Sequence, residues 1–180
     1  MTAAATSTPA PVIRRATAHD AENIAHVGRT SFRETFAHSC SEKDMQDFLD
    51  ATYNLDAVTS ELVNDHRRYF VATIDDVVVG FSSLSLDSDE PAVETYPNRV
   101  EFQRLYVDAA QHGKGVAKLL TYAAFDLARE MGKENIWLGV WEENARALKF
   151  YQKMGYKVVG EHVFMVGEDK QLDWIVVRPL

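Results

Sequence analysis

The sequence has little of several features that mark particular classes of protein. With a single cysteine, Cys40, it has no intrachain disulfide framework, and we expect a reducing, cytoplasmic setting. No apolar run approaches the roughly 18 residues that a membrane-spanning helix needs, so no membrane partner is expected. The six histidines show no spacing typical of a metal site, and we expect no bound metal.

Basic residues are also scarce relative to acidic ones. The chain has 19 Lys and Arg against 27 Asp and Glu, which gives a formal net charge of −8. Nucleic acids and anionic membranes are bound through cationic surfaces, so this balance argues against both as partners. It mildly favours a cationic substrate such as an amine, although solubility alone is the simpler explanation.

The residues that are present fit one mixed α/β domain. A chain of 180 residues, 46% of them apolar, is long enough for one hydrophobic core. Residues 1–11 are rich in Ala, Thr, Ser and Pro, and we expect a disordered tail there. The single domain is expected over residues 12–180.

Hydrophobic periodicity and turn signals predict the order of the elements. Strands are predicted at residues 12–16, 69–74, 77–86, 100–107, 136–140, 156–165 and 172–177. Helices are predicted from a capping segment at 17–20 through residue 36, from residue 41, and over 56–65, 116–131 and 144–155. Asp75 and Asp76 favour a tight turn between two strands, and residues 87–98 read as a loop. The order indicates an α/β (α+β) fold with a mixed, mostly antiparallel sheet of about seven strands flanked by helices.

Residues 105–117 are the most informative segment, because a strand leads there through a glycine-containing turn into a helix. The first turn of a helix presents unpaired N–H groups and a partial positive charge. Gly113 and Gly115 allow a phosphate to approach the backbone closely, and Lys114 adds a cation. The segment matches neither the P-loop nor the dinucleotide fingerprint, so a bare turn explains it equally well.

Two sequence blocks resemble a known family. The run from His112 to Ala117 resembles the Q/R-x-x-G-x-G/A signature of the GNAT superfamily of N-acetyltransferases, which binds the pyrophosphate of coenzyme A. The run from Asn144 to Tyr156 resembles the family block N-x-x-A-x-x-F-Y-x-x-x-G-F. Two departures are visible: His112 replaces the usual Gln or Arg, and Ala109 replaces a common Pro.

Residues 136–144, 150–155 and 160–167 further resemble PaiA-type acetyltransferases, which are similar to spermidine/spermine N-acetyltransferases. The resemblance covers about residues 12–180. It implies the GNAT fold, acetyl-CoA as co-substrate, and a primary amine of a small molecule, with a polyamine as one candidate. Homodimers are common among resembling proteins.

The resemblance also implies roles for individual residues. Backbone groups of the 105–107 strand would pair with coenzyme A like an added strand, the following turn would hold the pyrophosphate, and Asn144 would both cap a helix and touch the cofactor. The residues implied for cofactor binding are Leu105, Tyr106, Val107, His112, Gly113, Lys114, Gly115, Val116, Ala117 and Asn144.

Tyr151 matches the family tyrosine that protonates the departing thiolate, although a core aromatic is the ordinary reading of this position. Strand alternation places Glu101, Gln103, Leu105 and Val107 on one face. The family base lies on this strand. Gln103 cannot act as a base, whereas Glu101 can, through water. A solvated carboxylate at the strand end is the alternative.

Candidates for acceptor binding are less specific. Glu34, Glu142 and Glu143 can bind an amine or simply be surface charge, and Phe32, Phe36 and Trp141 can line an alkyl pocket or pack in the core. Two other functions stay open. One is acetylation of a protein, peptide or toxin amine. The other is a non-catalytic acyl-CoA-binding module on the same fold.

Overall fold

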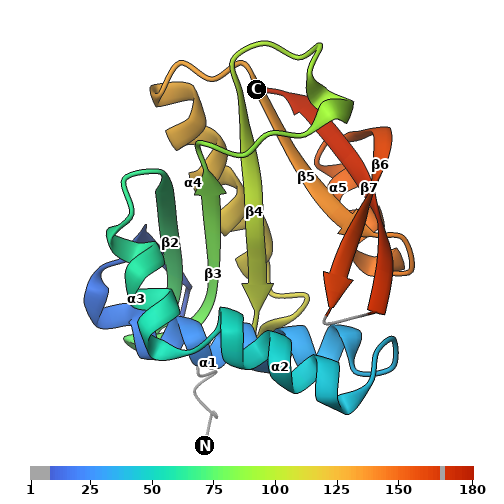
Figure 1. Cartoon of the computed structure of the whole chain (residues 1–180). Coiled ribbons are helices and arrows are strands. Elements are labelled where there is room, and N and C mark those ends of the chain that lie inside the picture. The colour runs from blue at the N-terminus through green and yellow to red at the C-terminus, as the bar shows by residue number, and fades with distance from the viewer. Residues whose placement is uncertain (1–8, 167–168) are drawn as a thin grey trace, which may run out of the picture.

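The computed structural model describes residues 9–166 and 169–180, in which seven strands form one sheet (Figure 1). Most of the expected tail, residues 1–8, and part of the expected hairpin turn, residues 167–168, lie outside the described residues. The strands are β1 (Val12–Arg15), β2 (Arg67–Ile74), β3 (Val77–Ser85), β4 (Arg99–Val107), β5 (Asn135–Trp141), β6 (Lys157–Val166) and β7 (Asp169–Pro179). Their order is β1-β2-β3-β4-β5-β7-β6, and the β4–β5 pair alone is parallel. The predicted seven-stranded, mostly antiparallel sheet is therefore confirmed.

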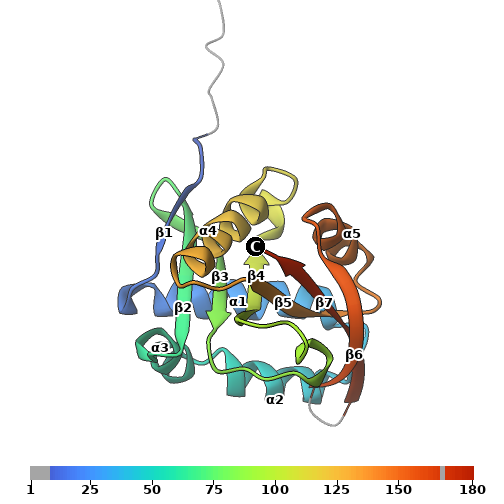
Figure 2. The same cartoon turned by 90° about the horizontal axis from the view of Figure 1, so that it is seen from above.

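Helices cover both faces of the sheet (Figure 2). The helices α1 (Ala21–Phe36), α2 (Glu42–Thr52) and α3 (Leu55–Val63) lie on one face, which we call the α1 face. The helices α4 (Val116–Glu130) and α5 (Ala145–Lys153) lie on the other, the α4 face. Short 3-10 turns η1 (Ala18–Asp20), η2 (Pro91–Val93) and η3 (Ala109–Gln111) complete the described elements.

Local chemistry explains most boundaries. Asp75 and Asp76 have φ values of 50° and 63°, so the predicted tight turn between β2 and β3 is confirmed. Ser41 and Asn54 accept hydrogen bonds from backbone N–H groups at the starts of α2 and α3. The strand β2 begins earlier than predicted, at Arg67, because its charged first residues pair with β3 although they break the apolar pattern.

The strand β4 contains a bulge that the sequence pattern does not predict. Its register against β3 shifts, so that Ser83 pairs with Arg104 while Leu84 pairs with Phe102, and Gln103 is the extra residue. An extra residue moves every later side chain to the opposite face.

The expectation that Glu101, Gln103, Leu105 and Val107 share one face is therefore wrong. Pairing with alternate residues of β3 places Glu101, Arg104 and Tyr106 on the α1 face. The core agrees with this assignment, because Tyr106 packs with the α1 cluster whereas Leu105 and Val107 pack with residues of α4.

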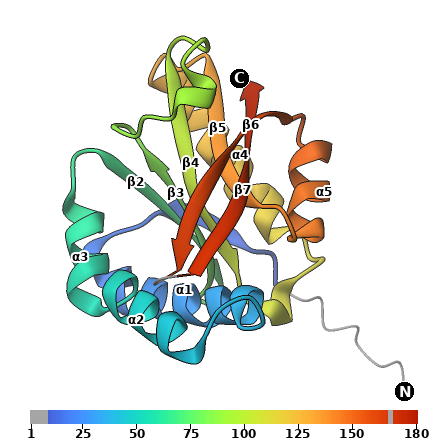
Figure 3. The same ribbon diagram turned by 45° about the vertical axis from the view of Figure 1, so that its right-hand side comes forward.

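The strands β4 and β5 are paired only at their first residues. Their register ends at Glu101 opposite Trp137, after which β4 follows β3 as far as Val107 and β5 follows β7 as far as Trp141. The two backbones draw apart toward their carboxyl ends (Figure 1). Seen from the side, the β6–β7 pair and α5 lie beyond this divergence, opposite α3 (Figure 3).

Candidate active site

The diverging edge of β4 offers unpaired backbone groups. The Asp108 N–H donates to the Val79 carbonyl of β3 at 2.9 Å. Because N–H groups alternate sides along a strand, those of Leu105 and Val107 point away from β3, toward the departed β5. An extended ligand that carries amide groups can pair with this edge as an added strand.

The turn after β4 fits an anion. Gly113 and Gly115 have φ values of 78° and 84°, in the left-handed region, and a Cβ built on either would meet nothing within 4 Å. Gly115 is also the N-cap of α4 and provides no side-chain cap, so the N–H groups of the first turn are left for a ligand. Lys114 is exposed and donates to Gln111 at 3.0 Å, while Val116 is buried and Ala117 is half-buried.

His112 links the end of β4 to the start of α5. Its Nε2 lies 2.9 Å from the Val107 carbonyl, and its Nδ1 lies 2.7 Å from Nη1 of Arg146 in the first turn of α5. Arginine only donates, so Nδ1 accepts in this contact and Nε2 is the nitrogen that donates to the Val107 carbonyl. Both nitrogens thus have protein partners, and the phosphate contact expected of His112 requires one of them to be released.

The helix α5 begins at Asn144, whose side chain accepts from the Ala147 N–H at 3.1 Å and leaves its amide nitrogen for other contacts. Tyr151 packs on the α4 face, with its ring centroid 5.3 Å from that of Phe150 and 5.4 Å from that of Tyr156. Burial raises the pKa of the Tyr151 phenol. The hydroxyl therefore keeps its proton at neutral pH.

Glu101 stands at the start of a chain of hydroxyl contacts. Its Oε2 accepts from Ser88 Oγ at 2.5 Å, Ser88 Oγ lies 2.6 Å from Ser85 Oγ, and Ser85 donates to Asp87 at 3.0 Å. The Asp87 side chain is 46% exposed. Burial raises the pKa of Glu101, although the Ser88 hydrogen bond opposes this effect. The partly buried carboxyl group of Glu101 is thus connected through hydroxyl groups to an exposed carboxylate.

Arg104 is the centre of a polar cluster on the α1 face. Its Nη1 contacts the Tyr69 hydroxyl and lies 3.3 Å from Glu61, and its guanidinium carbon lies 5.7 Å from the centre of the Tyr53 ring. Burial raises the pKa of Tyr69 to about 12. Sequence reasoning missed this arginine because the alternation pattern placed it on the other face.

The aromatic candidates form one cluster where α1 meets β5. The Phe36 ring lies 5.1 Å from that of Trp141 and 4.4 Å from that of Phe32, and all three are buried. The acidic candidates lie elsewhere. Glu142 and Glu143 are exposed just after β5. Glu34 is exposed on the side of α1 turned away from the core, and the structure does not bring it together with the other candidates.

Asp173 is a further candidate that sequence reasoning missed. It pairs with Trp141 across β5 and β7, and its Oδ2 lies 3.0 Å from a Cβ built on Gly139. Its Oδ1 is buried without a hydrogen-bond partner among the described residues. Burial raises the pKa of Asp173 to about 6, with a smaller opposing effect from His162. The one available signal was an acidic residue inside a predicted strand.

Tyr106 connects these groups electrostatically. Burial raises its pKa, a hydrogen bond with Tyr53 and the charge of Arg104 oppose this, and the nearby Tyr151 and Asp173 raise it further. The pKa of Tyr106 therefore depends on groups from both faces of the sheet. Tyr106 lies on β4, where this strand diverges from β5.

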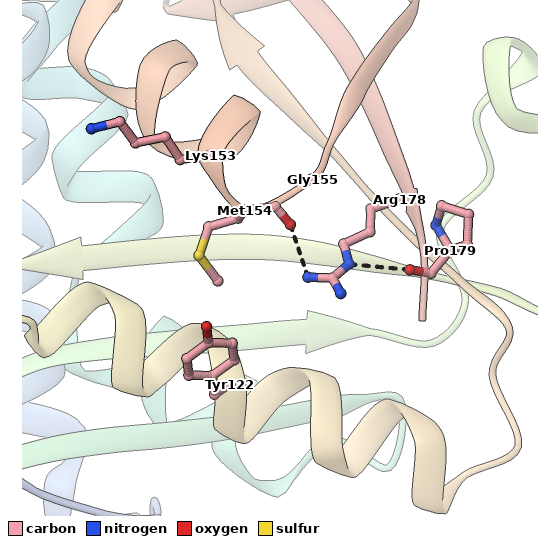
Figure 4. Close-up of a pocket in the computed structure, with 6 residues that line it drawn as sticks. All are labelled: Tyr122, Lys153, Met154, Gly155, Arg178 and Pro179. Carbon is pink, nitrogen blue, oxygen red and sulfur yellow. Dashed lines mark hydrogen bonds between the residues drawn. The ribbon is translucent and has the colours of Figure 1, made fainter.

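In the described part of the chain, two hollows flank α5. One, of about 440 Å³, lies between its end and α4; there Arg178 donates to the Met154 carbonyl at 2.8 Å and to the Pro179 carbonyl at 3.1 Å, opposite Tyr122 (Figure 4). The other, of about 880 Å³, lies between α5 and β6 and is lined in part by Tyr151 and Val158. Arg178 therefore acts as a structural link through its Nε and Nη1 atoms.

Two classes of site are not found in the described part of the chain. None of its helices is both long and apolar enough to cross a bilayer. Its His, Cys, Asp and Glu side chains form no group of three or more arranged to hold a metal ion.

Known proteins resemble this chain in both sequence and fold. A family model described as acetyltransferase (GNAT) family matches residues 28–156. An uncharacterized N-acetyltransferase of Lactobacillus delbrueckii subsp. lactis is 33% identical over 161 residues, covering 89% of this chain and 92% of that protein. A spermidine N(1)-acetyltransferase of Thermoplasma acidophilum is 25% identical over 150 residues, covering 81% and 88%.

The fold is shared with a crystal structure of the PaiA N-acetyltransferase from Thermoplasma acidophilum in complex with coenzyme A. The TM-score is 0.78 at 23% identity, over 95% of this chain and 99% of that one. The family resemblance inferred from the two sequence blocks is confirmed. The chain belongs to the acetyltransferase (GNAT) family.

Proposed function

We propose that this protein transfers the acetyl group of acetyl-CoA to a primary amine of a small cationic molecule, with a polyamine as the first candidate. One observation carries the proposal: β4 and β5 diverge between the glycine turn at Gly113 and Gly115, which we call the anion cradle, and the partly buried carboxyl groups of Glu101 and Asp173 on the α1 face. A relative named as a spermidine acetyltransferase and a structural neighbour crystallised with coenzyme A support it.

The residues present fit coenzyme A. The cofactor would supply an acetyl group activated as a thioester. The N–H groups of Leu105 and Val107 would pair with its amide-bearing arm, and the turn at Gly113 and Gly115 would hold its pyrophosphate. Asn144, with its amide nitrogen unused by the helix cap, would make a further contact.

Glu101 would accept the proton of the acceptor amine through water. An alkyl ammonium group has a pKa near 10 and must lose a proton before it can attack. The chain from Glu101 to Asp87 has three oxygen–oxygen contacts: Glu101–Ser88, Ser88–Ser85 and Ser85–Asp87. The two serine hydroxyl groups have only two hydrogens to donate, so one contact lacks a hydrogen. A proton on Glu101 supplies the missing hydrogen, and successive transfers along the chain then carry a proton to the exposed Asp87.

Tyr151 would supply the other proton. Its hydroxyl holds a proton at Oη, because burial of the ring raises the pKa of the phenol. That proton is available to the sulfur atom that leaves when the acetyl group is transferred. The two proton carriers act from opposite faces of the sheet, since Tyr151 packs on the α4 face and Glu101 lies on the α1 face.

Thiol release from acetyl-CoA tests the proposal, with polyamines, aminoglycosides, amino acids and peptides as acceptors. Amine-dependent release with small polyamines supports it. Release with peptides alone would favour a protein acceptor, and tight coenzyme A binding without any turnover would favour a non-catalytic module. Tyr151→Phe and Glu101→Gln should lose turnover while keeping cofactor affinity.

A cytoplasmic setting and a homodimer are further parts of the proposal. The single cysteine, Cys40, fits a reducing compartment. Light scattering of the purified chain measures its oligomeric state directly. A monomer at micromolar concentration would refute the dimer.

A further inference from the structure

Asp173 is a partly buried carboxyl group that no described side chain pairs with through a hydrogen bond or a salt bridge, although His162 has a small electrostatic effect on it. Its Oδ1 is inaccessible to solvent and has no hydrogen-bond partner among the described residues. His162, the residue opposite on β6, directs its Nδ1 to Glu90 Oε2 at 2.9 Å. Arg104 on the same face is engaged with Glu61 and Tyr69. A carboxylate with a buried oxygen that receives no hydrogen bond is costly, so its presence points to a missing partner.

The carboxyl group leans toward the divergence of β4 and β5. Its Oδ2 lies where a side chain on Gly139 would begin, 3.0 Å from the position of a Cβ there. Gly139 belongs to β5, is exposed, and lies on the α1 face between Trp137 and Trp141. Because position 139 is glycine, no side chain of β5 stands where Oδ2 of Asp173 lies, and the carboxyl group is close enough to Tyr106 to raise the pKa of its phenol.

The register separates Asp173 from Glu101. Glu101 is level with Trp137, and Asp173 is level with Trp141, four residues further along β5. At about 3.3 Å per residue, the two carboxyl-bearing positions are roughly 13 Å apart along the strand direction. Glu101 is tied to the Ser88 hydroxyl chain, whereas Asp173 has no such connection among the described residues. The two groups therefore have different tasks.

We propose that Asp173 is the anionic anchor of the acceptor and receives hydrogen bonds from one of its ammonium groups over Gly139. An ammonium group offers three donors and a full positive charge, which matches a carboxylate whose Oδ1 receives no hydrogen bond from the described residues. This inference rests on the proposed function and adds the site of charge recognition. The acceptor class it selects is a primary amine that carries at least one ammonium group.

Asp173→Asn tests the anchor, because it removes the charge while keeping the size of the side chain. The matched control is Glu161→Gln, an exposed carboxylate on the adjacent strand, level with Trp174 and thus on the opposite face. Initial rates with acetyl-CoA are measured for n-butylamine and for 1,4-diaminobutane. We expect Asp173→Asn to raise KM by about 10- to 100-fold, with a smaller change in kcat, and the control to leave both unchanged.

The two acceptors distinguish which ammonium group is held. A raised KM for both amines assigns Asp173 to the reacting amine, and a raised KM for the diamine alone assigns it to the second ammonium. Unchanged KM for both amines in a folded Asp173→Asn variant would overturn the proposal. Gly139→Ala is the second variant: its methyl group displaces the carboxylate without removing the charge, and it should also raise KM.

Calorimetry separates this inference from the proposed function. Binding of 1,4-diaminobutane to the protein saturated with coenzyme A is measured without turnover. Binding that is lost in Asp173→Asn but kept in Glu161→Gln supports the anchor even if no acetylation is observed. Equal binding in wild type and Asp173→Asn, or no binding to wild type, overturns the anchor and leaves the proposed acetyl transfer to its own assay.

Discussion

Asp173→Asn should stabilise the folded protein at alkaline pH, in addition to weakening acceptor binding. Burial raises the pKa of Asp173 from 3.8 to about 6, so the folded state binds the proton more tightly than the unfolded state does. Stability therefore falls as pH rises from about 4 to about 6 and is constant above that range. Asparagine cannot titrate, so this loss is absent from the variant.

The magnitude follows from the two pKa values. Their difference corresponds to a destabilisation of about 3 kcal/mol at pH 8 and about 1 kcal/mol at pH 4.5. Because the side chain is only partly buried, solvent reduces the change between these conditions to about 1–2 kcal/mol.

Urea unfolding of wild type, Asp173→Asn and Glu161→Gln at both pH values measures this change. The gain of Asp173→Asn over wild type should be larger at pH 8 by that amount, and Glu161→Gln should show no such dependence. An equal gain at both pH values would refute the reasoning.

The two effects of this substitution have opposite signs, which makes the pair of measurements informative. If the carboxylate served packing alone, its replacement would make the protein less stable and leave KM unchanged. A carboxylate that is present to bind a ligand destabilises the protein when the ligand is absent. Its replacement therefore makes the protein more stable and weakens its affinity for the acceptor. Stability and acceptor affinity measured on one variant therefore separate the two explanations.

Three other predictions concern the cofactor side and the proton route. Tyr151→Phe should lower kcat by about 10²- to 10³-fold without changing coenzyme A affinity in calorimetry; a parallel loss of affinity would instead indicate a packing role. Ser88→Ala should lower kcat about tenfold because it breaks the hydroxyl chain, and Ser88→Thr, which keeps a hydroxyl, should retain activity; equal rates in the two variants would contradict the chain. Gly115→Ala and Gly132→Ala both place alanine at positive φ and should each lower the free energy of unfolding in urea by about 1–2 kcal/mol. Only Gly115→Ala should weaken coenzyme A binding, since Gly132 lies at the far end of α4. Equal cofactor affinity in the two variants would argue against the anion cradle.

Most of the fold follows from local patterns. The helical stripe over α4, the cap at Asn144 and the turn at Asp75 and Asp76 depend on residues close together in the sequence, and each is predicted to within a few residues. The anion cradle is likewise local, because its chemistry belongs to backbone N–H groups and to the φ values that glycine permits. For these features, neighbouring residues contain the necessary information.

The bulge in β4 is a different case. Nothing near Gln103 in the sequence distinguishes a regular strand from one with an extra residue, since the shift is defined by pairing with Ser83 and Leu84 of β3. Strict alternation therefore predicts Glu101 on the same face as Leu105 and Arg104 on the opposite face, away from Glu101. One unpredicted residue changed which side chains share the α1 face, although every strand around it was predicted.

The same reasoning explains why the motifs indicate the cofactor better than the acceptor. The cofactor region is built from two continuous segments around Gly115 and Asn144, which a pattern can match. The proposed acceptor region combines Glu101 on β4, Gly139 on β5 and Asp173 on β7, and these meet only through the strand order β4-β5-β7. Relatives can therefore share both motifs and still differ in the charges that face the acceptor. Substrate preference within the family should follow the residues at these three positions more closely than it follows overall sequence identity.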